Sequence, residues 1–308
     1  MKVVVDTLLS EPLSASLFLS DEWLACYAGK ATRYAVVDEH ESIRARFVLY
    51  SGGRGWFKTW ITPPGIPNIG LEVYHTKSNT AKQHHFHKQV IEVLATFLRS
   101  SKRHAYKIDL PTHWIDTQPL QWQGFEVKPR YTYRVALSQS EELMLQAMDS
   151  SKRNKIHKAQ REGYSMTHEP APAELFDFVR MQYKQAGVFL HAEMIERMLH
   201  LLSSHQGVWT GVYKDGKLVA ANVCAVVQEE AINLFSGVDK DHGTAAGPLC
   251  LYESMLECKR RGLEVFDFEG SSVPSIEQYF RSFGGMMTTY FTATSGKTPW
   301  RQWLKYRS

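Results

Sequence analysis

The chain has 308 residues, of which 44% are hydrophobic and 12% aromatic, so it holds enough apolar material for two ordinary hydrophobic cores. Its 36 Lys and Arg residues against 32 Asp and Glu residues leave a formal net charge of only +4, which argues against a protein that coats DNA with a basic surface. No apolar run approaches the roughly 18 residues that span a membrane. Asp6 and Glu11 interrupt the stretch where a signal peptide would be apolar. We therefore expect a cytoplasmic protein of two domains that binds neither membranes nor DNA.

The first domain is expected to cover residues 1–138 and to mix helices with strands. Hydrophobic residues at steps of three and four predict an amphipathic helix over 80–99. The prolines of the stretch 55–73 cannot donate to a sheet ladder, which places this stretch in a loop or at a sheet edge. Strands are predicted at 31–39, 43–51, 105–111 and 124–137.

The second domain is expected to cover residues 139–308 and to begin with a basic helix at 150–162. Asp215 and Gly216 lie between two apolar runs, which is typical of a tight β-hairpin, and a third strand at 231–238 completes an antiparallel meander. Further helices are predicted at 171–186, 191–204, 248–261 and 274–282, and further strands at 264–270 and 287–293.

Three stretches of the second half, 148–164, 209–241 and 266–285, resemble the FemAB/FemX group of the acyl-CoA N-acyltransferase (GNAT) superfamily, and 63–70 and 124–138 are similar to the group's amino-terminal domain. The resemblance implies an α+β fold of two GNAT-like domains in tandem, each a mixed, mostly antiparallel sheet flanked by helices. It also implies an acyl or aminoacyl transferase that acts on an amine, with acyl-CoA or aminoacyl-tRNA as a cosubstrate and no tightly bound cofactor.

The loop after the third meander strand is the candidate cradle for the donor. In GNAT-like proteins a Q/R-x-x-G-x-G/A pattern presents backbone N–H groups to a pyrophosphate at a helix start. Lys240, Gly243 and Ala245 have that spacing, with Lys in place of Gln or Arg, and Gly247 begins the next helix. A surface loop whose glycines only turn the chain would show the same pattern, so the donor stays open between acyl-CoA and aminoacyl-tRNA.

Proton transfer from an amine needs a base, and the strand 264–270 offers two carboxylates. Alternation places Asp267 and Glu269 on one face, where two neighbouring carboxylates can raise one another's pKa. Glu269 is our first candidate for the general base and Asp267 the second. The alternative is that Glu269 pairs with Arg281 or caps a helix while Asp267 satisfies backbone donors. The resemblance places the oxyanion-binding N–H within 233–237, where a bulge and a plain strand end fit equally well.

The helix that follows this strand departs from the group's pattern. Members commonly carry Phe-Lys and then another basic residue, whereas this chain has Tyr279 and Phe280, with Arg281 keeping the second cation. Tyr279 is then a general acid or a packing residue, and Arg281 is a candidate contact for an anionic substrate. The missing Lys speaks against peptidoglycan peptides as acceptor more than it speaks against acyl transfer.

The basic helix 150–162 spreads its cations over nearly its whole circumference. One interpretation is a solvated connector between the domains. The other is an anion-binding wall beside the interdomain cleft, with Lys152, Arg153 and Lys155 as contacts for the phosphates of CoA or the acceptor end of a tRNA. This second interpretation also allows another class of function, a non-catalytic module that binds RNA or a nucleotide-linked ligand.

Metal and disulfide chemistry are not expected. His84 and His87 share a face of the helix 80–99, with His85 beside them, but the sequence offers no third ligand in a recognisable spacing. The four cysteines, which form no CxxC pair, are expected to be reduced core residues: Cys26, Cys224, Cys250 and Cys258.

Overall fold

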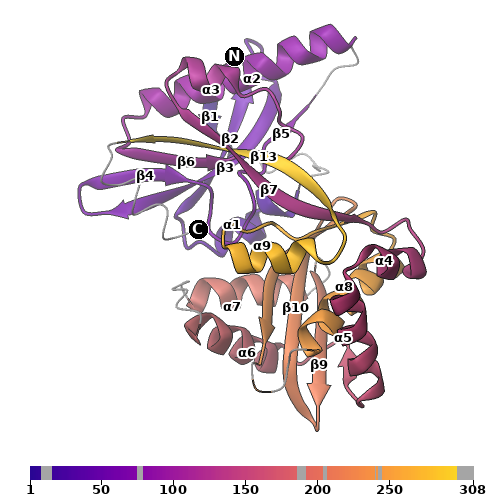
Figure 1. The fold of residues 1–308 in the computed structure, drawn as a ribbon. Helices are drawn as coiled ribbons and strands as arrows, with labels where there is room; N and C mark the ends of the chain where they lie inside the picture. Colours follow the sequence, from indigo (N-terminus) through magenta and orange to yellow (C-terminus); the bar gives the residue numbers. More distant parts are fainter. Residues whose placement is uncertain are drawn as a thin grey trace. The chain divides into compact units, whose positions relative to one another are not determined.

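The structure is a computed structural model that describes residues 1–7, 16–74, 79–185, 192–203, 207–239, 241 and 245–296 (Figure 1). The chain forms two compact units, which we call unit 1 (Met1–Arg130 with Thr289–Ser308) and unit 2 (Tyr131–Thr288). Within the described ranges, no helix combines the length and the apolar composition needed to cross a membrane.

Unit 1 is built on a mostly antiparallel sheet in the order β1-β2-β3-β4-β6-β13, with the short β5 beside β3. The pair β4–β6 is parallel, because α2 connects these two strands on one face of the sheet. The strands are β1 (Lys2–Val5), β2 (Ala31–Val37), β3 (Ile43–Arg54), β4 (Phe57–Ile61), β5 (Glu72–Val73), β6 (Ala105–Asp109) and β13 (Met286–Gly296).

The long helix α2 (Thr80–Ser100) supplies much of the core of unit 1. Val90, Ile91, Leu94 and Leu98 recur at helical spacing and are fully buried against the sheet. Asn79 caps the helix by accepting a hydrogen bond from the backbone N–H of the third residue of the first turn. The shorter helices of this unit are η1 (Leu17–Leu19), α1 (Asp21–Ala25) and α3 (Gln118–Trp122).

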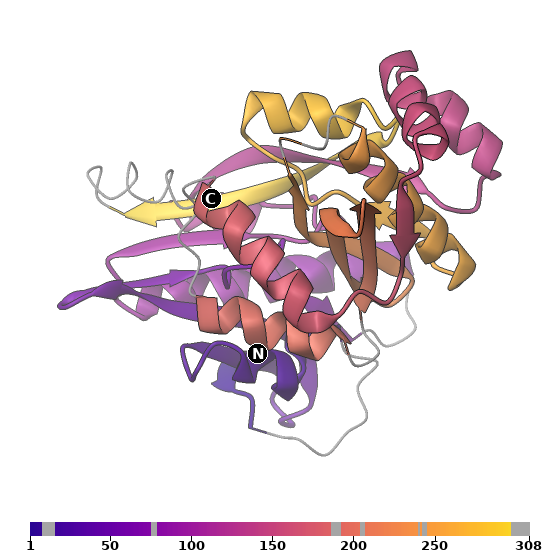
Figure 2. The ribbon, with the colours of Figure 1, turned by 90° about the horizontal axis from the view of Figure 1, so that it is seen from below.

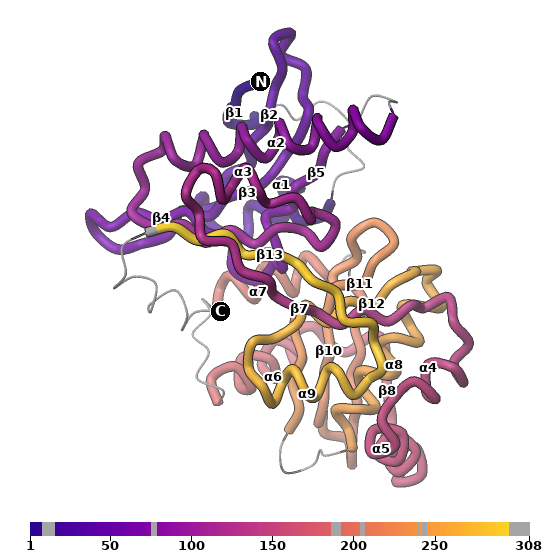
Figure 3. Tube along the Cα trace, turned by 45° about the horizontal axis from the view of Figure 1, so that its top comes forward, coloured from indigo at the N-terminus to yellow at the C-terminus, as the bar shows by residue number. Residues whose placement is uncertain are grey.

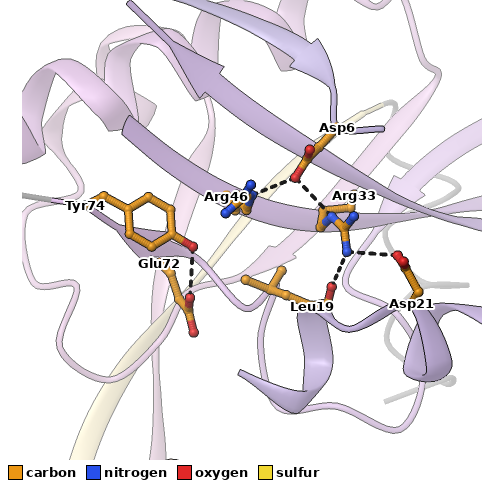
Figure 4. A network of polar contacts seen from close by, with 7 residues as sticks. All are labelled: Asp6, Leu19, Asp21, Arg33, Arg46, Glu72 and Tyr74. Carbon is orange, nitrogen blue, oxygen red and sulfur yellow. Dashed lines mark hydrogen bonds and ion pairs between the residues drawn. The ribbon is translucent and has the colours of Figure 1, made fainter. Parts of the chain in front are cut away.

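A buried group of charges ties β1, β2 and β3 together (Figure 4). The side chain of Asp6 is fully buried, and its Oδ2 accepts hydrogen bonds from Arg33 Nε at 3.0 Å and Arg46 Nε at 2.7 Å. Arg33 also donates to the carbonyl oxygen of Leu19 at 2.7 Å and to Asp21 at 3.0 Å. One buried carboxylate therefore bridges two guanidinium groups, Asp21 supplies a second negative charge, and Arg33 fixes the segment before α1 to the sheet.

Unit 2 contains an antiparallel meander with a parallel strand added to it, in the order β12-β11-β10-β9-β8, and β7 pairs with β12. At the turn of the β9–β10 hairpin, Asp215 and Gly216 have φ values of 51° and 76°, which confirms the predicted tight turn. The strands are β7 (Glu126–Ala136), β8 (Ser165–Thr167), β9 (Gly207–Lys214), β10 (Lys217–Val227), β11 (Glu230–Val238) and β12 (Val265–Asp267).

Helices cover both faces of this meander. The pair α6 and α7 lies on one face, and α5 and α8 lie on the other (Figures 1 and 2). After β7 the chain passes through α4 and α5 before it enters β8 (Figure 3). The helices are α4 (Glu141–Ala147), α5 (Ser150–Arg161), α6 (Pro172–Gln185), α7 (Ala192–Leu201), α8 (Ala246–Arg260) and α9 (Pro274–Arg281).

The predicted α+β class with GNAT-like sheets is confirmed, while three details differ from the sequence prediction. The compact units divide the chain at residues 130 and 131 rather than after 138, because β7 is one long strand that runs from unit 1 into unit 2. Residues 289–308, predicted in the second domain, belong to unit 1, because β13 pairs with β6. The strand predicted over 264–270 ends at Asp267, because Glu269 and Gly270 turn the chain with positive φ values.

The variant Asp6→Asn tests the buried charge group of unit 1. Because it removes the charge that two buried arginines share, we expect the free energy of unfolding to fall by about 3–5 kcal/mol in urea denaturation. The matched control is Asp21→Asn, whose side chain is 51% exposed, and its expected cost is below about 1 kcal/mol. Equal losses in the two variants would contradict a central role for Asp6.

Candidate active site

The strands β11 and β12 run parallel for a short distance and then separate. Their last paired residues are Ile232 and Asp267. Beyond this point β12 turns away, with φ values of 62° at Glu269 and 76° at Gly270. Only glycine fits at position 270, since a Cβ there would lie 2.2 Å from the carbonyl oxygen of Tyr131. The separation of the strands is therefore built into the backbone of unit 2.

The strand β11 carries a bulge just beyond the same point. Val223 of β10 pairs with Phe235, whereas the next residue, Cys224, pairs with Asn233, so Leu234 is the extra residue. A bulged residue is left out of the regular ladder, and its strand bends. The bulge lies within 233–237, the range in which the sequence placed a backbone N–H for an oxyanion.

A closed network of side chains spans the bulge from β10 to β11. Asn222 Nδ2 donates to Asn233 Oδ1 at 2.6 Å and to Ser236 Oγ at 2.8 Å. Ser236 Oγ in turn donates to Asn233 Oδ1 at 2.8 Å, and the Cys224 thiol donates to Asn222 Oδ1 at 3.1 Å. Asn222 is 1% exposed and Asn233 5% exposed, so their buried amides depend on partners within the network, whereas Ser236 is exposed at its end. The network holds the two strands together where their backbone register shifts.

Tyr183 of α6 approaches the bulge on the opposite face of the sheet. Its hydroxyl lies 3.5 Å from the carbonyl oxygen of Leu234, at the long limit of a hydrogen bond, and its ring meets that of Phe235 edge-on. Burial, together with the nearby carboxylate of Glu269, raises the pKa of Tyr183. The Tyr183 hydroxyl therefore stays protonated between the bulge and Glu269.

Asp267 is buried among groups of its own sheet. Its Oδ1 accepts hydrogen bonds from Thr132 Oγ1 at 2.6 Å and from the backbone N–H of Glu269 at 2.8 Å. Its Oδ2 lies 3.4 Å from Arg134 Nε. Burial raises the pKa of Asp267, and these partners oppose that effect. This arrangement is the alternative that the sequence left open, in which Asp267 satisfies backbone donors and fixes the turn.

Glu269 is the carboxylate that follows the end of β12. The residue is half-buried, and its left-handed backbone directs the chain away from β11. Arg281, its alternative partner in the sequence, instead donates to Glu277 Oε1 at 3.0 Å along α9. Of the two carboxylates proposed as base, Glu269 is thus the one placed at the strand separation.

The start of α8 is covered by protein. Ala245 and Gly247 are buried, and a Cβ at Gly247 would lie 3.1 Å from the hydroxyl oxygen of Tyr279. Burial and the nearby Cys250 raise the pKa of Tyr279, so its hydroxyl remains protonated. Two other residues of the predicted cradle, Lys240 and Gly243, lie outside the described residues.

Comparison with known families identifies the segment that contains these groups. Residues 150–281 match the model of an acetyltransferase (GNAT) domain, and this range runs from the start of α5 to the end of α9. This segment, which lies in unit 2, is thus a GNAT-like domain. No curated protein sequence matches it.

Solved structures share the fold over nearly the whole chain. The crystal structure of FemX is 12% identical, has a TM-score of 0.65, and the match covers 94% of this chain and 97% of FemX. The C-terminal domain of a putative lysylphosphatidylglycerol synthetase from Agrobacterium fabrum is 12% identical with a TM-score of 0.61, over 92% and 89% of the two chains. The structure of L-PGS from Bacillus licheniformis is 10% identical with a TM-score of 0.59, over 96% and 98%. The chain thus has a FemX-like fold.

Lys152 is the unusual cation of this GNAT domain. It is only 9% exposed, and its Nζ lies 3.9 Å from the ring centroid of Tyr279 and 5.6 Å from that of Phe283. Among the described residues it forms no ion pair with a carboxylate. Burial and the neighbouring charge of Lys155 lower the pKa of Lys152 to about 8, although Asp149 acts in the opposite direction. The faces of the Tyr279 and Phe283 rings therefore take the place of a counter-ion for the Lys152 ammonium group.

The other cations of α5 have more ordinary surroundings. Arg153 donates to the carbonyl oxygens of Gln146 at 3.2 Å and of Met148, so it caps the end of α4. Lys158 lies 3.6 Å from Glu162 within the helix. Lys155 is half-buried beside Lys152. Of the three cations predicted to contact donor phosphates, Arg153 thus donates to backbone carbonyls, Lys152 is buried and Lys155 is half-buried.

Sequence reasoning missed Tyr183 and the side-chain network of the bulge. The signal for the network was present, because Asn222 and Asn233 are polar residues inside two otherwise apolar strands, and buried amides need partners. The signal for Tyr183 was absent, since a Tyr on an amphipathic helix usually packs. The described residues contain no group of three metal-ligating side chains.

The variant Lys152→Met tests the burial of this cation. Below pH 8 the folded and unfolded chains both bind the Lys152 proton, whereas between about 8 and 10.4 only the unfolded chain binds it. The stability of the wild type should therefore rise with pH in this window relative to the variant, by on the order of 1–3 kcal/mol. Urea denaturation at a series of pH values measures the difference, and a difference that does not change with pH would refute the assignment.

The variant Asn222→Ala tests the network at the bulge. Removal of the amide takes away one of the two donors to the buried Asn233 Oδ1 and the acceptor of the buried Cys224 thiol, so the free energy of unfolding should fall by about 1–3 kcal/mol. Asn154→Ala, on the exposed face of α5, is the matched control and should change it by less than about 0.5 kcal/mol. A neutral Asn222→Ala variant would mean that the bulge is held by the backbone alone.

Proposed function

We propose that the chain is an N-acyltransferase that moves an aminoacyl group onto an amine where β11 and β12 separate. The observation that carries this proposal is that the end of the strand pairing, the bulge at Leu234 and the turn at Glu269 coincide at one level of the sheet. Where the strands separate, their backbone N–H and C=O groups do not bond to each other and can bind the donor. A carboxylate lies beside them.

In the proposed reaction the amine attacks the carbonyl carbon of the donor. The backbone N–H at Leu234 donates a hydrogen bond to the oxygen on which negative charge develops. Glu269 accepts the proton that the attacking amine gives up. A C–N bond forms, the C–O bond of an ester or the C–S bond of a thioester breaks, and the proton passes to the leaving oxygen or sulfur.

For the donor we propose aminoacyl-tRNA, with acyl-CoA as the second candidate. A pyrophosphate cradle requires accessible N–H groups at a helix start, whereas the start of α8 is buried beneath Tyr279. The name of one structural neighbour, a putative lysylphosphatidylglycerol synthetase, refers to the transfer of a lysyl group, and the FemAB resemblance implies aminoacyl-tRNA. We assign Tyr279 to covering α8 rather than to acid catalysis.

The cations of the GNAT domain divide into two roles under this proposal. Lys155 on α5 and Arg281, which is 60% exposed on α9, are available to donor phosphates. Lys152 supports them indirectly, because it holds Tyr279 through its ring face. The acceptor is proposed to present a primary amine, and the proposed location of the enzyme is the cytoplasm.

Thermal-shift measurements distinguish the two donors. A ligand that binds only the folded chain raises its Tm, so we expect lysyl-tRNA to raise Tm more than uncharged tRNA does, and acetyl-CoA to leave it unchanged. A rise with acetyl-CoA alone would reject the tRNA donor while leaving acyl transfer intact. Transfer of radiolabelled lysine from lysyl-tRNA to glycinamide, a small primary amine, measures the reaction itself.

The variant Glu269→Gln tests the proposed base. Loss of the proton acceptor should lower kcat for lysyl transfer by about 10²–10⁴-fold, while the shift in Tm caused by lysyl-tRNA persists. Glu264→Gln, an exposed position just before β12, is the matched control and should stay within about twofold of the wild type. Full activity of Glu269→Gln would remove Glu269 from the reaction.

A further inference from the structure

A surface of unit 1 joins two segments that are far apart in the sequence, the turn between β3 and β4 and the loop between α2 and β6. The backbone N–H of Lys58 donates to His104 Nδ1 at 3.0 Å, and the backbone N–H of His104 donates to the carbonyl oxygen of Lys58 at 2.8 Å. The strands that follow, β4 and β6, pair in parallel. We call this the Trp56 surface; it consists of Arg54, Trp56, Lys58, Lys102, Arg103 and His104.

Trp56 is 75% exposed, whereas Trp60 in the adjoining strand is 7% exposed. Its ring meets those of Phe57 and His104 at angles of 85° and 78°, so neither ring stacks on it. The turn that presents it is specified, because a Cβ at Gly53 would lie 1.9 Å from the carbonyl oxygen of Phe57. A large ring on a fixed turn, without apolar cover, is available to a partner.

The charge around this ring has one sign. Residues 51–61 and 99–108 contain no Asp or Glu, and Arg54, Lys58, Lys102 and Arg103 lie in them. In the described part of the chain none of these four cations forms an ion pair. Because the whole chain has a formal net charge of only +4, such a group of uncompensated cations is a local feature of this surface.

Packing explains only one of these side chains. Arg103 is half-buried, and its guanidinium lies 4.9 Å from the ring centroid of Trp60, so it contributes to the fold. Arg54, Lys58 and Lys102 are exposed, as is Trp56. An acidic peptide would use the cations and leave the indole unused, whereas unstacked bases joined by phosphates would use both.

We propose that the Trp56 surface binds single-stranded nucleic acid, with a base stacked on Trp56 and phosphates held by Arg54, Lys58 and Lys102. A duplex keeps its bases stacked on each other, so it cannot offer a base to the indole. This surface lies in unit 1 and uses none of the groups assigned to acyl transfer, so the inference does not depend on the proposed reaction.

Fluorescence anisotropy of a labelled twelve-nucleotide oligouridylate with the full chain tests the stacking contact. Trp56→Ala should weaken binding by about tenfold or more, and Trp56→Phe should keep most of the affinity. The matched control is Trp122→Ala, because Trp122 is 62% exposed in the same unit and already has Lys88 5.0 Å from its ring centroid. Equal losses in Trp56→Ala and Trp122→Ala, or no binding by the wild type at low salt, would overturn the proposal.

A salt series tests the phosphate contacts. The slope of log affinity against log salt should become shallower by about 0.7 for each of Lys58→Ala and Lys102→Ala, and should not change for the exposed Lys82→Ala. Oligothymidylate that binds as well as oligouridylate supports stacking without contacts to the 2′-hydroxyl, and preference for oligouridylate supports RNA. Equal or tighter binding of a duplex of the same length would overturn the proposal.

The proposed transfer reaction and the proposed Trp56 surface can be disproved independently. Glu269→Gln should bind the oligonucleotide as the wild type does, whatever its transfer activity. Loss of oligonucleotide binding in Trp56→Ala with intact lysyl transfer to glycinamide at saturating lysyl-tRNA would support a docking surface that is distinct from the transfer site. Absence of lysyl transfer in the wild type, together with oligonucleotide binding that depends on Trp56, would support this surface and reject the proposed lysyl transfer.

Discussion

The backbone hydrogen bonding between β11 and β12 stops at Ile232 and Asp267, and the whole candidate site depends on that interruption. A parallel pair that continued would use the backbone groups of Leu234 in its own ladder. Instead, the carboxylate of Asp267 accepts a hydrogen bond from the backbone N–H of Glu269, so a side chain replaces a backbone acceptor of the neighbouring strand. The same carboxylate thus bonds to the residue whose φ value is 62°, where the chain turns away from β11.

The two units stabilise their buried cations in different ways. In unit 1 two arginines share the carboxylate of Asp6, which links the end of β1 to β2 and β3 through buried ion pairs. In unit 2 the ammonium of Lys152 rests on the faces of Tyr279 and Phe283, where a ring quadrupole compensates only part of the cost of burial. The first arrangement pairs the buried cations with a carboxylate, whereas the second leaves a buried ammonium group whose pKa is lowered to about 8.

The sequence was sufficient for the features that short-range patterns control. The spacing of Val90, Leu94 and Leu98 predicted α2, and the Asp215-Gly216 pair predicted the β9–β10 hairpin. It was not sufficient for the end of β12, because the segment 264–270 alternates without interruption. The requirement for Gly270 comes from the carbonyl of Tyr131, which belongs to a different part of the chain.

The candidate site shows the same limit at the level of single residues. Glu269 could be chosen from its position at the end of an alternating strand, and the range of the bulge could be named. The division of labour between Asp267 and Glu269 could not, since it depends on Thr132 and Arg134 across the sheet. Likewise, nothing in the run of cations on α5 distinguishes Lys152, which is buried by rings from α9, from Arg153, which caps α4.

The position of β13 in the sequence affects the order in which the two units of this protein can fold. Residues 292–296 pair with 105–109 of β6, so unit 1 receives the strand beside β6 from a part of the chain that is synthesised after all of unit 2. Unit 2, by contrast, is continuous in sequence. During synthesis on a ribosome, unit 1 is therefore the first unit to begin and the last to be completed. One edge of β6 stays unpaired while some 180 further residues, from 109 to 292, are synthesised. The amino-terminal half of this chain is an unfinished sheet until its carboxyl-terminal strand arrives.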